Sequence, residues 1–305
     1  MPKTNMPQGA LLADAADEWD LAMRAANKSP ATRKVYGTAV AQLTTWLAEH
    51  GRPDATTDDV TAGEVRGYLA DVLARTSDST AITRHGGLQA FWKWCCQEGL
   101  AETDPTALVE KPRRSMPVVP VLQDDQVKAI LATCERDFYG IRDEAVIRML
   151  LGTGMRRGEC AGLSLADVDL KAQTAHIVRG KGGKGRVVYF PDHTALALRR
   201  YLRARALHRL AHLEALWLGK EQAFGGAGIQ QMLQRRAAWA GVERANPHAW
   251  RHLFAHSWLS KGGTEGSLMA SAGWSNRAMI DRYGRSAAAG RAQAEAARLG
   301  IGQGL

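Results

Sequence analysis

The 305-residue sequence lacks the features that mark several large classes of protein. It contains no run of about 18 or more apolar residues and no signal-peptide pattern over residues 1–10, which argues against membrane insertion and secretion. It also contains no G-x-x-x-x-G-K-[ST] string, so a P-loop nucleotide site is excluded. We therefore expect a cytoplasmic protein that does not bind ATP through a P-loop.

Cysteine is scarce, with four in the chain, and their spacing fits no set of metal ligands. Cys95 and Cys96 lie in an apolar helical stretch and are interpreted as core thiols. Carboxylates do not cluster at metal spacing either, so we predict no metal and no cofactor. Acidic residues number 31 against 40 Lys and Arg, which gives a net charge of +9. This balance favours a polyanionic partner, although a basic surface that is only solvated gives the same charge.

The N-terminal third of the chain is predicted to form a small all-helical bundle. A weak helical pattern covers residues 11–27, and a clearer one follows Ser29-Pro30, where proline stands at the first helical position. Thr61 and Glu64 form a capping box ahead of the next helix, and Ser79-Thr80 is predicted to open a further one. The polar residues expected on the surface either line a DNA groove or form a solvated face: Thr32, Arg33, Lys34, Thr83, Arg84, His85 and Lys93.

A proline-rich stretch, residues 108–120, is predicted to link two domains. Its prolines remove backbone donors and fix φ, which excludes a helix or a central strand. It carries the basic string Lys111-Pro112-Arg113-Arg114, which suits a segment along a phosphate backbone, although linkers are commonly polar because they are solvated. We therefore expect one domain over residues 1–107 and another over residues 121–305.

The second domain is predicted to combine helices with a small β-sheet. Helices are expected over residues 124–134 and 141–152. Two strands, Thr174–Arg179 and Val187–Phe190, flank a glycine-rich basic turn, which predicts a hairpin. The whole chain is therefore predicted to be mostly α-helical, with a small sheet in the second domain.

Further helices are predicted after the hairpin. Residues 192–218 are expected to form one long helix or two, and residues 225–240 another. Arg235 and Arg236 on the latter either contact a DNA backbone or belong to a solvated face. The stretch Ser286–Leu299 is alanine-rich and predicted to be helical. The apolar face of the helix over residues 225–240 is predicted to consist of Ile229, Met232, Leu233 and Trp239.

The last quarter of the chain carries the most informative pattern. Asn246 is a predicted helix N-cap, and Pro247 stands at the first helical position, where a missing N–H costs nothing. His248 and Arg251 are three residues apart, so they share a face within the first two turns. Free backbone N–H groups and the helix dipole favour an anion there, which indicates a phosphate site.

A tyrosine follows on another predicted short helix. Tyr283 stands after a predicted cap at Ser275, with Met279 and Ile280 expected to hold the same face of the helix against a core. A tyrosine near a positive anion site is a candidate nucleophile.

Taken together, these elements resemble the tyrosine recombinases, also called phage integrases. That family's pattern has an H-x-x-R helix, a G-[H/W] pair and a tyrosine nine residues further on. Here these are His248 with Arg251, Gly273-Trp274 and Tyr283. The family's T-G-x-R string, which carries its first catalytic arginine, is Thr153–Arg156 here. The resemblance covers nearly the whole chain, and its elements stand in the expected order.

The resemblance implies roles for further residues. Glu159 would orient Arg156 or its helix. The family places its catalytic lysine on the hairpin in a G-K-G string, which is Lys181 here, with Lys184 as the rival. Arg157-Gly158 departs from the family's more usual apolar-Ser pair, so the role of Arg157 stays open.

The reaction implied by the resemblance is transesterification at a DNA phosphodiester. The Tyr283 oxygen would displace the 5′-oxygen and leave a 3′-phosphotyrosyl link, which retains the bond energy. Because tyrosine's ordinary pKa is about 10, a base or a positive field is needed, and His248 is the candidate. Trp274 would donate its indole N–H to phosphate or buttress the tyrosine, a core aromatic being the alternative. The catalytic residues implied are Arg156, Lys181, His248, Arg251, Trp274 and Tyr283.

The resemblance also implies an architecture and an assembly. An N-terminal helical SAM-like core-binding domain and an α+β catalytic domain would clamp double-stranded DNA. A nucleoid-associated homotetramer would integrate or excise DNA at specific sites through a Holliday junction, with accessory directionality or bending factors as further partners. Two alternatives stay open: a non-catalytic DNA-binding or architectural protein, and a nicking-closing enzyme like a type IB topoisomerase.

Overall fold

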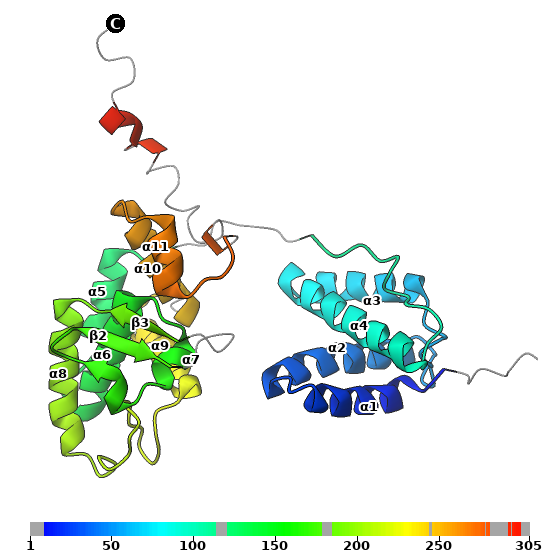
Figure 1. The fold of residues 1–305 in the computed structure, drawn as a ribbon, viewed down its shortest axis with the longest axis horizontal. Helices are drawn as coiled ribbons and strands as arrows, with labels where there is room; N and C mark the ends of the chain where they lie inside the picture. The colour runs from blue at the N-terminus through cyan, green and yellow to red at the C-terminus, as the bar shows by residue number, and fades with distance from the viewer. Residues whose placement is uncertain are drawn as a thin grey trace, which may run out of the picture. The chain divides into compact units, whose positions relative to one another are not determined.

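The chain divides into two compact units, Met1–Met116 and Pro117–Leu305, each drawn in Figure 1. Each unit has a hydrophobic core of its own, as two independent domains would. No helix among the described residues is long and apolar enough to cross a membrane. The computed structural model describes residues 9–113, 121–178, 185–243, 246–277, 279–280, 292–293 and 295–299.

The first unit is a bundle of helices, as predicted. The second and fourth helices make its most extensive pairing, and the first helix packs against the second. Apolar side chains from all of them meet in one core, which includes Trp19, Leu43, Leu69 and Trp92. The helices are α1 (Leu12–Ala25), α2 (Pro30–Glu49), α3 (Ala62–Arg75) and α4 (Asp78–Glu98).

The predicted caps of α2 and α3 are confirmed. The Ser29 Oγ accepts a hydrogen bond from the Thr32 backbone N–H at 3.2 Å. In the capping box of α3, the Glu64 N–H donates to Thr61 Oγ1 at 3.2 Å, and the Thr61 N–H donates to Glu64 Oε2 at 2.8 Å. Side chains therefore satisfy N–H groups that have no intrahelical partner.

The fourth helix differs from the prediction at its start and on its surface. Ser77, not Ser79, caps it by accepting from the Thr80 N–H at 3.2 Å, so the helix begins at Asp78. His85 was expected at the surface but is 1% exposed, with its Nε2 3.0 Å from the carbonyl oxygen of Val109. The histidine is buried because the chain beyond α4 packs back against it, which periodicity within the helix does not reveal.

The second unit combines helices with a small antiparallel sheet of order β1-β2-β3. The predicted hairpin is confirmed between β2 and β3, where Thr174 pairs with Tyr189 and Ile177 pairs with Arg186. Strand β1 was not predicted. The elements are α5 (Asp124–Ala132), α6 (Phe138–Thr153), α7 (Arg157–Ala161), the 3-10 helix η1 (Leu165–Asp167), β1 (Val168–Asp169), β2 (Thr174–Ile177), β3 (Arg186–Tyr189), α8 (Asp192–Ala206), α9 (Gly226–Trp239), α10 (Pro247–Ser260) and α11 (Glu265–Ala272).

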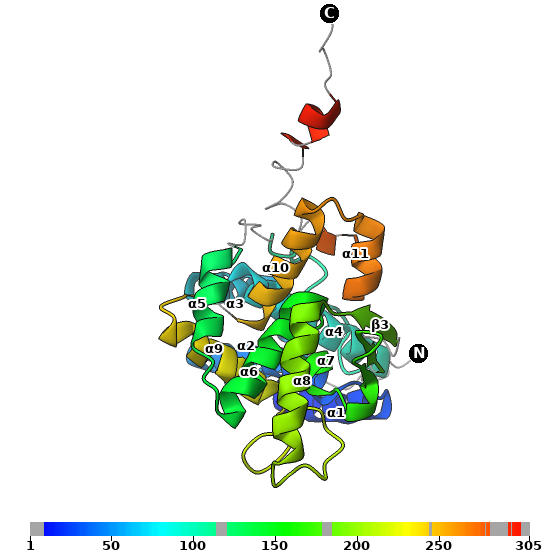
Figure 2. The ribbon, with the colours of Figure 1, turned by 90° about the vertical axis from the view of Figure 1, so that its left-hand side faces the viewer.

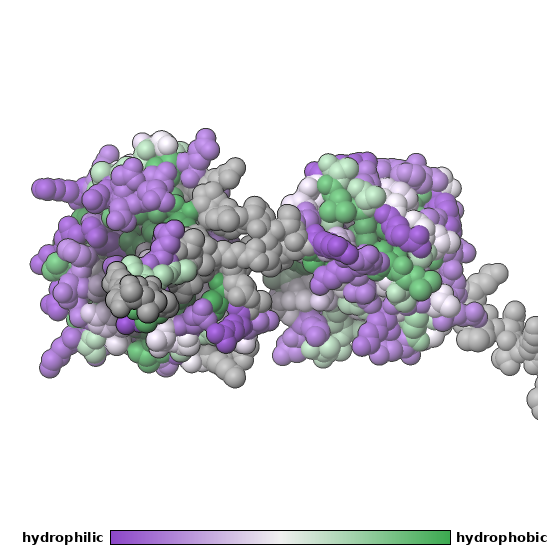
Figure 3. Space-filling model, turned by 90° about the horizontal axis from the view of Figure 1, so that it is seen from above, coloured by the Kyte–Doolittle hydropathy of each residue, from purple (hydrophilic) through white to green (hydrophobic). Residues whose placement is uncertain are grey.

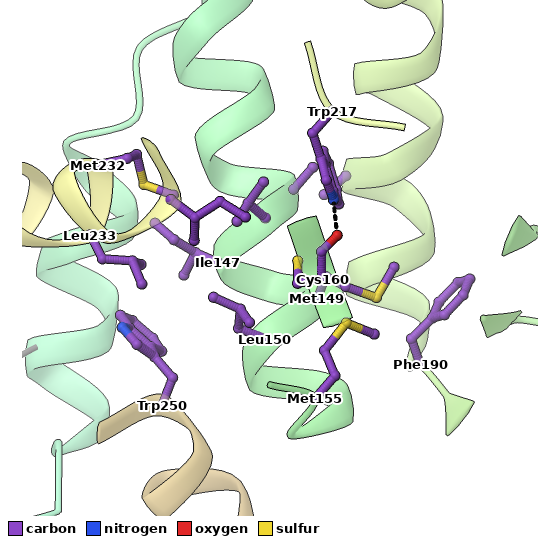
Figure 4. Close-up of a cluster of buried hydrophobic side chains, with 14 of the residues drawn as sticks. Ile147, Met149, Leu150, Met155, Cys160, Phe190, Trp217, Met232, Leu233 and Trp250 are labelled. Carbon is purple, nitrogen blue, oxygen red and sulfur yellow. Dashed lines mark hydrogen bonds between the residues drawn. The ribbon is translucent and has the colours of Figure 1, made fainter. Parts of the chain in front are cut away.

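Helix α6 runs through the core of the second unit, where side chains of α9, α10 and the sheet meet it (Figure 4). Ile147 and Leu150 of α6 lie between Leu233 of α9 and the segment around Trp217. The Trp217 indole N–H donates to the Cys160 carbonyl at 2.9 Å, so this buried polar group is satisfied. The α6 C-terminus, from which the candidate site begins, is thereby held in a packed core.

The prediction of helix throughout residues 192–218 was wrong beyond α8. Residues 207–225 contain neither a long helix nor a strand. The cause is Arg205, which is 4% exposed and donates to carbonyls of the loop that folds around it. These bonds satisfy carbonyls that a continuing helix would have bonded internally. The acceptors are the carbonyl oxygens of Ala211, Leu213, Ala215 and Leu216.

Two predictions for α9 were also wrong. Arg236 is neither at a DNA-facing surface nor solvated: it is 4% exposed, and its Nε and Nη2 donate to Asp143 Oδ2 at 3.0 and 2.7 Å. Trp239, expected in the core, is 61% exposed. Its ring lies 5.4 Å from the Arg235 guanidinium carbon and 5.0 Å from that of Arg236. The tryptophan thus covers two cations at the end of the helix.

Helices α10 and α11 lie side by side at one end of the second unit (Figures 1 and 2). A third cluster of buried side chains joins them, and Ile280 belongs to it with Met279 packed alongside, as predicted. The cluster between α10 and α11 contains Phe254, Ala255, Leu259, Leu268, Ala272, Trp274 and Ile280.

Most of the described surface on the face in Figure 3 is hydrophilic, which fits the many exposed charged residues.

Candidate active site

The predicted start of α10 is confirmed. Asn246 Oδ1 accepts from the backbone N–H groups of His248 and Ala249 at 3.0 and 3.1 Å, and Pro247 is the first helical residue. His248 is exposed in the first turn, whereas Arg251 is 4% exposed. The two side chains therefore start from the same end of the helix but differ in burial.

We predict that Asn246→Ala weakens this helix start. The two bonded N–H groups would lose their acceptor, and loss of such a cap costs about 1 kcal/mol, or roughly 2–4 °C in Tm. Thermal unfolding of the variant beside the wild type measures this. An unchanged Tm would show that the side chain contributes nothing to the helix start.

Arg251 joins two other elements to α10. Its terminal nitrogens donate to the carbonyls of Gly154 and Ala272, and its guanidinium carbon lies 5.1 Å from the centre of the Trp274 ring. Gly154 caps α6 at φ +60°, a conformation that glycine adopts without strain. A Cβ at Gly154 would also lie 2.2 Å from the Phe254 ring. The arginine is therefore fixed against the ends of α6 and α11.

Arg156 is fixed from the other side of the same glycine turn. It is the N-cap residue of α7, and its Nη1 donates to Glu159 Oε1 at 2.7 Å. Its Nη2 donates to the Gly273 carbonyl at 2.9 Å. These two bonds anchor the side chain, and because it is 32% exposed, part of it still faces solvent. The predicted link between Glu159 and Arg156 is present in this geometry.

The end of α11 collects arginines from three elements. The carbonyls of Ser271, Ala272 and Gly273 each accept from a different guanidinium, which comes from β3, α10 and the start of α7 respectively. The last carbonyls of a helix lack intrahelical partners and carry a partial negative charge, so cations stabilise them. These bonds gather positive charge at one place. The three arginines are Arg186, Arg251 and Arg156.

Gly273 is required in this arrangement. Its φ is +63°, which favours glycine. A Cβ there would lie 2.8 Å from Nη1 of Arg186. The glycine of the predicted Gly-Trp pair therefore makes room for a guanidinium.

Glu159 is the negative charge at the centre of the cluster. Burial alone would raise the pKa of its carboxyl, but hydrogen bonds from Arg186 and Arg156 outweigh burial and lower the pKa from 4.5 to about 2. The side chain is 5% exposed. The carboxylate is therefore ionised at neutral pH and shared by two arginines.

We predict that Glu159 contributes to stability in a pH-dependent way. Because its pKa is lowered in the folded state, its contribution is complete above 4.5 and is lost as the pH falls through about 2. Glu159→Gln removes the titrating group, so the difference in free energy of unfolding between wild type and variant should shrink over this range. Urea unfolding at a series of acidic pH values measures it, and a difference independent of pH would contradict the assignment.

The structure brings together some of the predicted site residues. Arg156, Arg251 and Trp274 meet around the end of α11, and Trp274 is 6% exposed in the third core cluster. His248 lies at the start of α10. The other predicted residues, Lys181, its rival Lys184 and Tyr283, lie outside the described residues.

Sequence reasoning missed Arg186 as a site residue. The arginine stood at the end of the basic turn and was assigned to no contact. No signal in the sequence marked it, because its acceptors are a carboxylate and a backbone carbonyl far away in the chain. The open role of Arg157 is structural in this fold: its Nη1 donates to Gln230 Oε1 and joins α7 to α9.

Chemically, the cluster suits an oxyanion with several negatively charged oxygens. Two guanidiniums with forked donors, one partly exposed and one buried, meet at the end of α11, and the exposed His248 precedes Arg251 by three residues on α10. Among the described residues, no three His, Cys, Asp or Glu side chains gather as metal ligands would. The cluster therefore presents fixed cationic donors of the kind that bind a phosphate group.

Comparison with known proteins identifies the class. The "Phage integrase family" profile matches residues 120–289, and the "Phage integrase, N-terminal SAM-like domain" profile matches residues 16–102. Tyrosine recombinase XerD of Ralstonia nicotianae is 31% identical over 222 residues, which are 71% of each chain. The chain therefore belongs to the phage integrase family of tyrosine recombinases, enzymes that perform site-specific DNA recombination by cleaving and rejoining strands.

Solved structures share the fold. A lambda integrase dimer bound to a COC′ core site aligns with a TM-score of 0.71 at 15% identity, covering 90% of this chain and 95% of that one. A lambda integrase tetramer bound to a Holliday junction aligns with a TM-score of 0.69 at 14% identity, covering 88% and 78%. At these identities the likeness extends to the fold, and the predicted class of a mostly helical chain with a small sheet in its second part is confirmed.

Proposed function

We propose that this chain cleaves and rejoins specific double-stranded DNA sites through a covalent 3′-phosphotyrosyl intermediate formed by Tyr283. The observation that carries the proposal is the convergence of Arg156 and Arg251 on the end of α11. Trp274 follows directly after this end, nine residues before that tyrosine in the sequence. We assign residues 1–107 to core binding, 108–120 to the linker and 121–305 to catalysis.

The arginines stabilise the transition state. Attack on the scissile phosphate gathers negative charge on its non-bridging oxygens, and fixed guanidinium donors offset that charge without reorganising. Arg251 is held by two backbone carbonyls, and Arg156 by a carboxylate and a carbonyl. Both are preorganised by the fold. In water the same donors would have to be ordered during the reaction.

The remaining residues transfer protons or support the segment that carries the nucleophile. His248, exposed at the start of α10, takes the proton of the tyrosine hydroxyl. Lys181, or Lys184 in its place, protonates the 5′-oxygen as it leaves. Trp274 packs in the third core cluster, where it supports Arg251 and the segment that leads to Tyr283. No cofactor takes part in the scheme, because the phosphotyrosyl link conserves the energy of the bond that breaks.

The partner and the assembly follow from this chemistry. Two duplexes must exchange strands, so four active sites are needed, and we propose a homotetramer that passes through a Holliday junction. The related lambda integrase, in a solved structure, is a tetramer bound to a Holliday junction. The net charge of +9 supports binding to DNA. We place the protein in the cytoplasm, on chromosomal DNA, with accessory directionality or bending factors as further partners.

A nicked suicide duplex tests the proposal. The purified wild-type protein is incubated, in the presence of a metal chelator, with duplexes from the flanks of its own gene, and products are separated on a denaturing gel. We expect a covalent adduct and a free 5′-hydroxyl that a polynucleotide kinase labels without prior phosphatase treatment. Salt-sensitive binding without an adduct, over a varied set of sites, would support the non-catalytic DNA-binding alternative.

A further inference from the structure

We propose that Arg186 is a positioning residue of the recombination reaction, which acts on Arg156 through the carboxylate that the two arginines share. The inference rests on the proposed function, because it takes Arg156 as a ligand of the scissile phosphate. Arg186 belongs to β3 and is separate from the six residues to which the catalytic roles were assigned.

The contacts of Arg186 are those of a fixed group. Its Nη1 and Nη2 donate to Oε1 and Oε2 of Glu159 at 3.1 and 2.8 Å. Its Nε donates to the Ser271 carbonyl at 2.8 Å, and its side chain is 12% exposed. Each nitrogen therefore has an acceptor, and the planar fork matches the carboxylate in a bidentate way.

Both oxygens of Glu159 serve both arginines. Oε1 accepts from Nη1 of Arg156 at 2.7 Å as well as from Arg186. Oε2 accepts from the Arg156 backbone N–H at 2.8 Å as well as from Arg186. The carboxylate thus fixes the side chain and the backbone of Arg156 while Arg186 holds the carboxylate itself.

Charge gives Arg186 a second effect. Two guanidiniums and one carboxylate leave one net positive charge in the trio, whereas Arg156 and Glu159 alone form a neutral pair. Glu159 is 5% exposed, so solvent and salt screen its charge weakly. Without Arg186, the carboxylate would cancel much of the field that Arg156 exerts on a bound phosphate. Arg186 offsets the carboxylate and leaves Arg156 effectively cationic.

The position of Arg186 in the sequence is a third argument for this role. Arg186 is the first residue of β3, and in the sequence it stands five positions after Lys181 and two after Lys184. The same bonds that hold Glu159 tie this strand to the end of α11. One side chain therefore fixes both the start of β3 and the carboxylate that holds Arg156.

Single-turnover cleavage of the suicide duplex by three variants tests the inference. Arg186→Lys keeps the charge and should stay within about fivefold of the wild type, whereas Arg186→Gln should lose on the order of 30-fold. Adding Glu159→Gln to Arg186→Gln removes the uncompensated carboxylate and restores one net positive charge. We expect the double variant to recover roughly fivefold or more relative to Arg186→Gln. A purely structural role predicts a double variant at least as impaired as the single one.

A modified substrate separates the charge effect from a general distortion. A methylphosphonate at the scissile position lacks one charged non-bridging oxygen, so its reaction requires less positive charge from the site. The defect of Arg186→Gln should therefore shrink by on the order of fivefold on this substrate. An equal defect on both substrates would overturn the proposal.

Control variants distinguish a failure of this inference from a failure of the proposed function. Arg200→Gln removes an arginine of the same unit that pairs with Glu144 at 2.9 Å and is 50% exposed, and it should cleave at the wild-type rate. DNA binding and thermal unfolding confirm that each variant is folded, and Arg186→Met, which also removes the charge, replaces Arg186→Gln if the latter is not folded. A wild-type protein that forms no adduct overturns the proposed function and this inference with it. An active wild type with a fully active Arg186→Gln overturns the role of Arg186 alone.

Discussion

Tyr283→Phe is expected to form no covalent adduct under conditions in which the wild-type protein accumulates one. The substitution removes the oxygen of the proposed nucleophile and keeps the aromatic ring of the side chain. Because DNA affinity depends mainly on contacts between basic side chains and phosphates, binding should stay close to that of the wild type. A denaturing gel measures the adduct, and a mobility-shift titration at two salt concentrations measures binding.

A second tyrosine serves as the matched control. Tyr189 of β3 is 59% exposed, and its hydroxyl lies 3.3 Å from Gln173 Oε1. Tyr189→Phe should form the adduct at the wild-type rate, because this hydroxyl is not the proposed nucleophile. An adduct that persists in Tyr283→Phe would assign the nucleophile to another side chain, and peptide mapping of the adduct would identify it.

Local signals predicted the helix starts well. Ser29, Thr61 and Asn246 cap helices in the structure because a cap is decided by a few neighbouring residues. The hairpin of β2 and β3 was also predictable, since alternation and a glycine-rich turn are local features. Strand β1 escaped notice because two residues are too few to show an alternating pattern.

Buried arginines account for the main errors. Arg236 was assigned to a surface because arginines are rarely buried, yet its partner Asp143 lies 93 positions away in the sequence. Arg205 likewise ends a predicted helix by bonding to carbonyls of a loop. Neither partner is visible to helical periodicity, which records only which side of a helix is apolar. Long-range ion pairs and backbone acceptors require the fold.

The residues of the candidate site were likewise predictable only where a local motif contained them. Motif spacing pointed to Arg156, Arg251 and Trp274, and the fold brings these three together. Arg186 had no such motif, because its acceptors are a carboxylate 27 positions away and a backbone carbonyl 85 positions away. A carbonyl is present in every residue, so the sequence gives no sign of which one will be used.

Arg251→Ala is expected to reduce cleavage by on the order of a hundredfold to a thousandfold, since the proposed mechanism makes this guanidinium a fixed donor to the transition state. It should also destabilise the fold. The carbonyls of Gly154 and Ala272 would lose a donor at a buried position, and an unsatisfied buried group costs about 1–3 kcal/mol. Single-turnover cleavage and urea unfolding measure the two effects separately.

The two effects of Arg251 can be told apart with a lysine and with a nearby surface arginine. Arg251→Lys retains a positive charge but cannot bridge two carbonyls, so it should lose much of the cleavage rate although it conserves the charge of the site. Arg277→Ala removes an arginine that is 79% exposed and pairs with Glu265, and both its stability and its cleavage rate should stay near wild type. If Arg251→Lys cleaved as fast as the wild type, charge alone would suffice. The geometry set by the ends of α6 and α11 would then have no part in catalysis. The cleavage rate of Arg251→Lys therefore decides whether the arginine acts through the fixed orientation of its guanidinium or only through its charge.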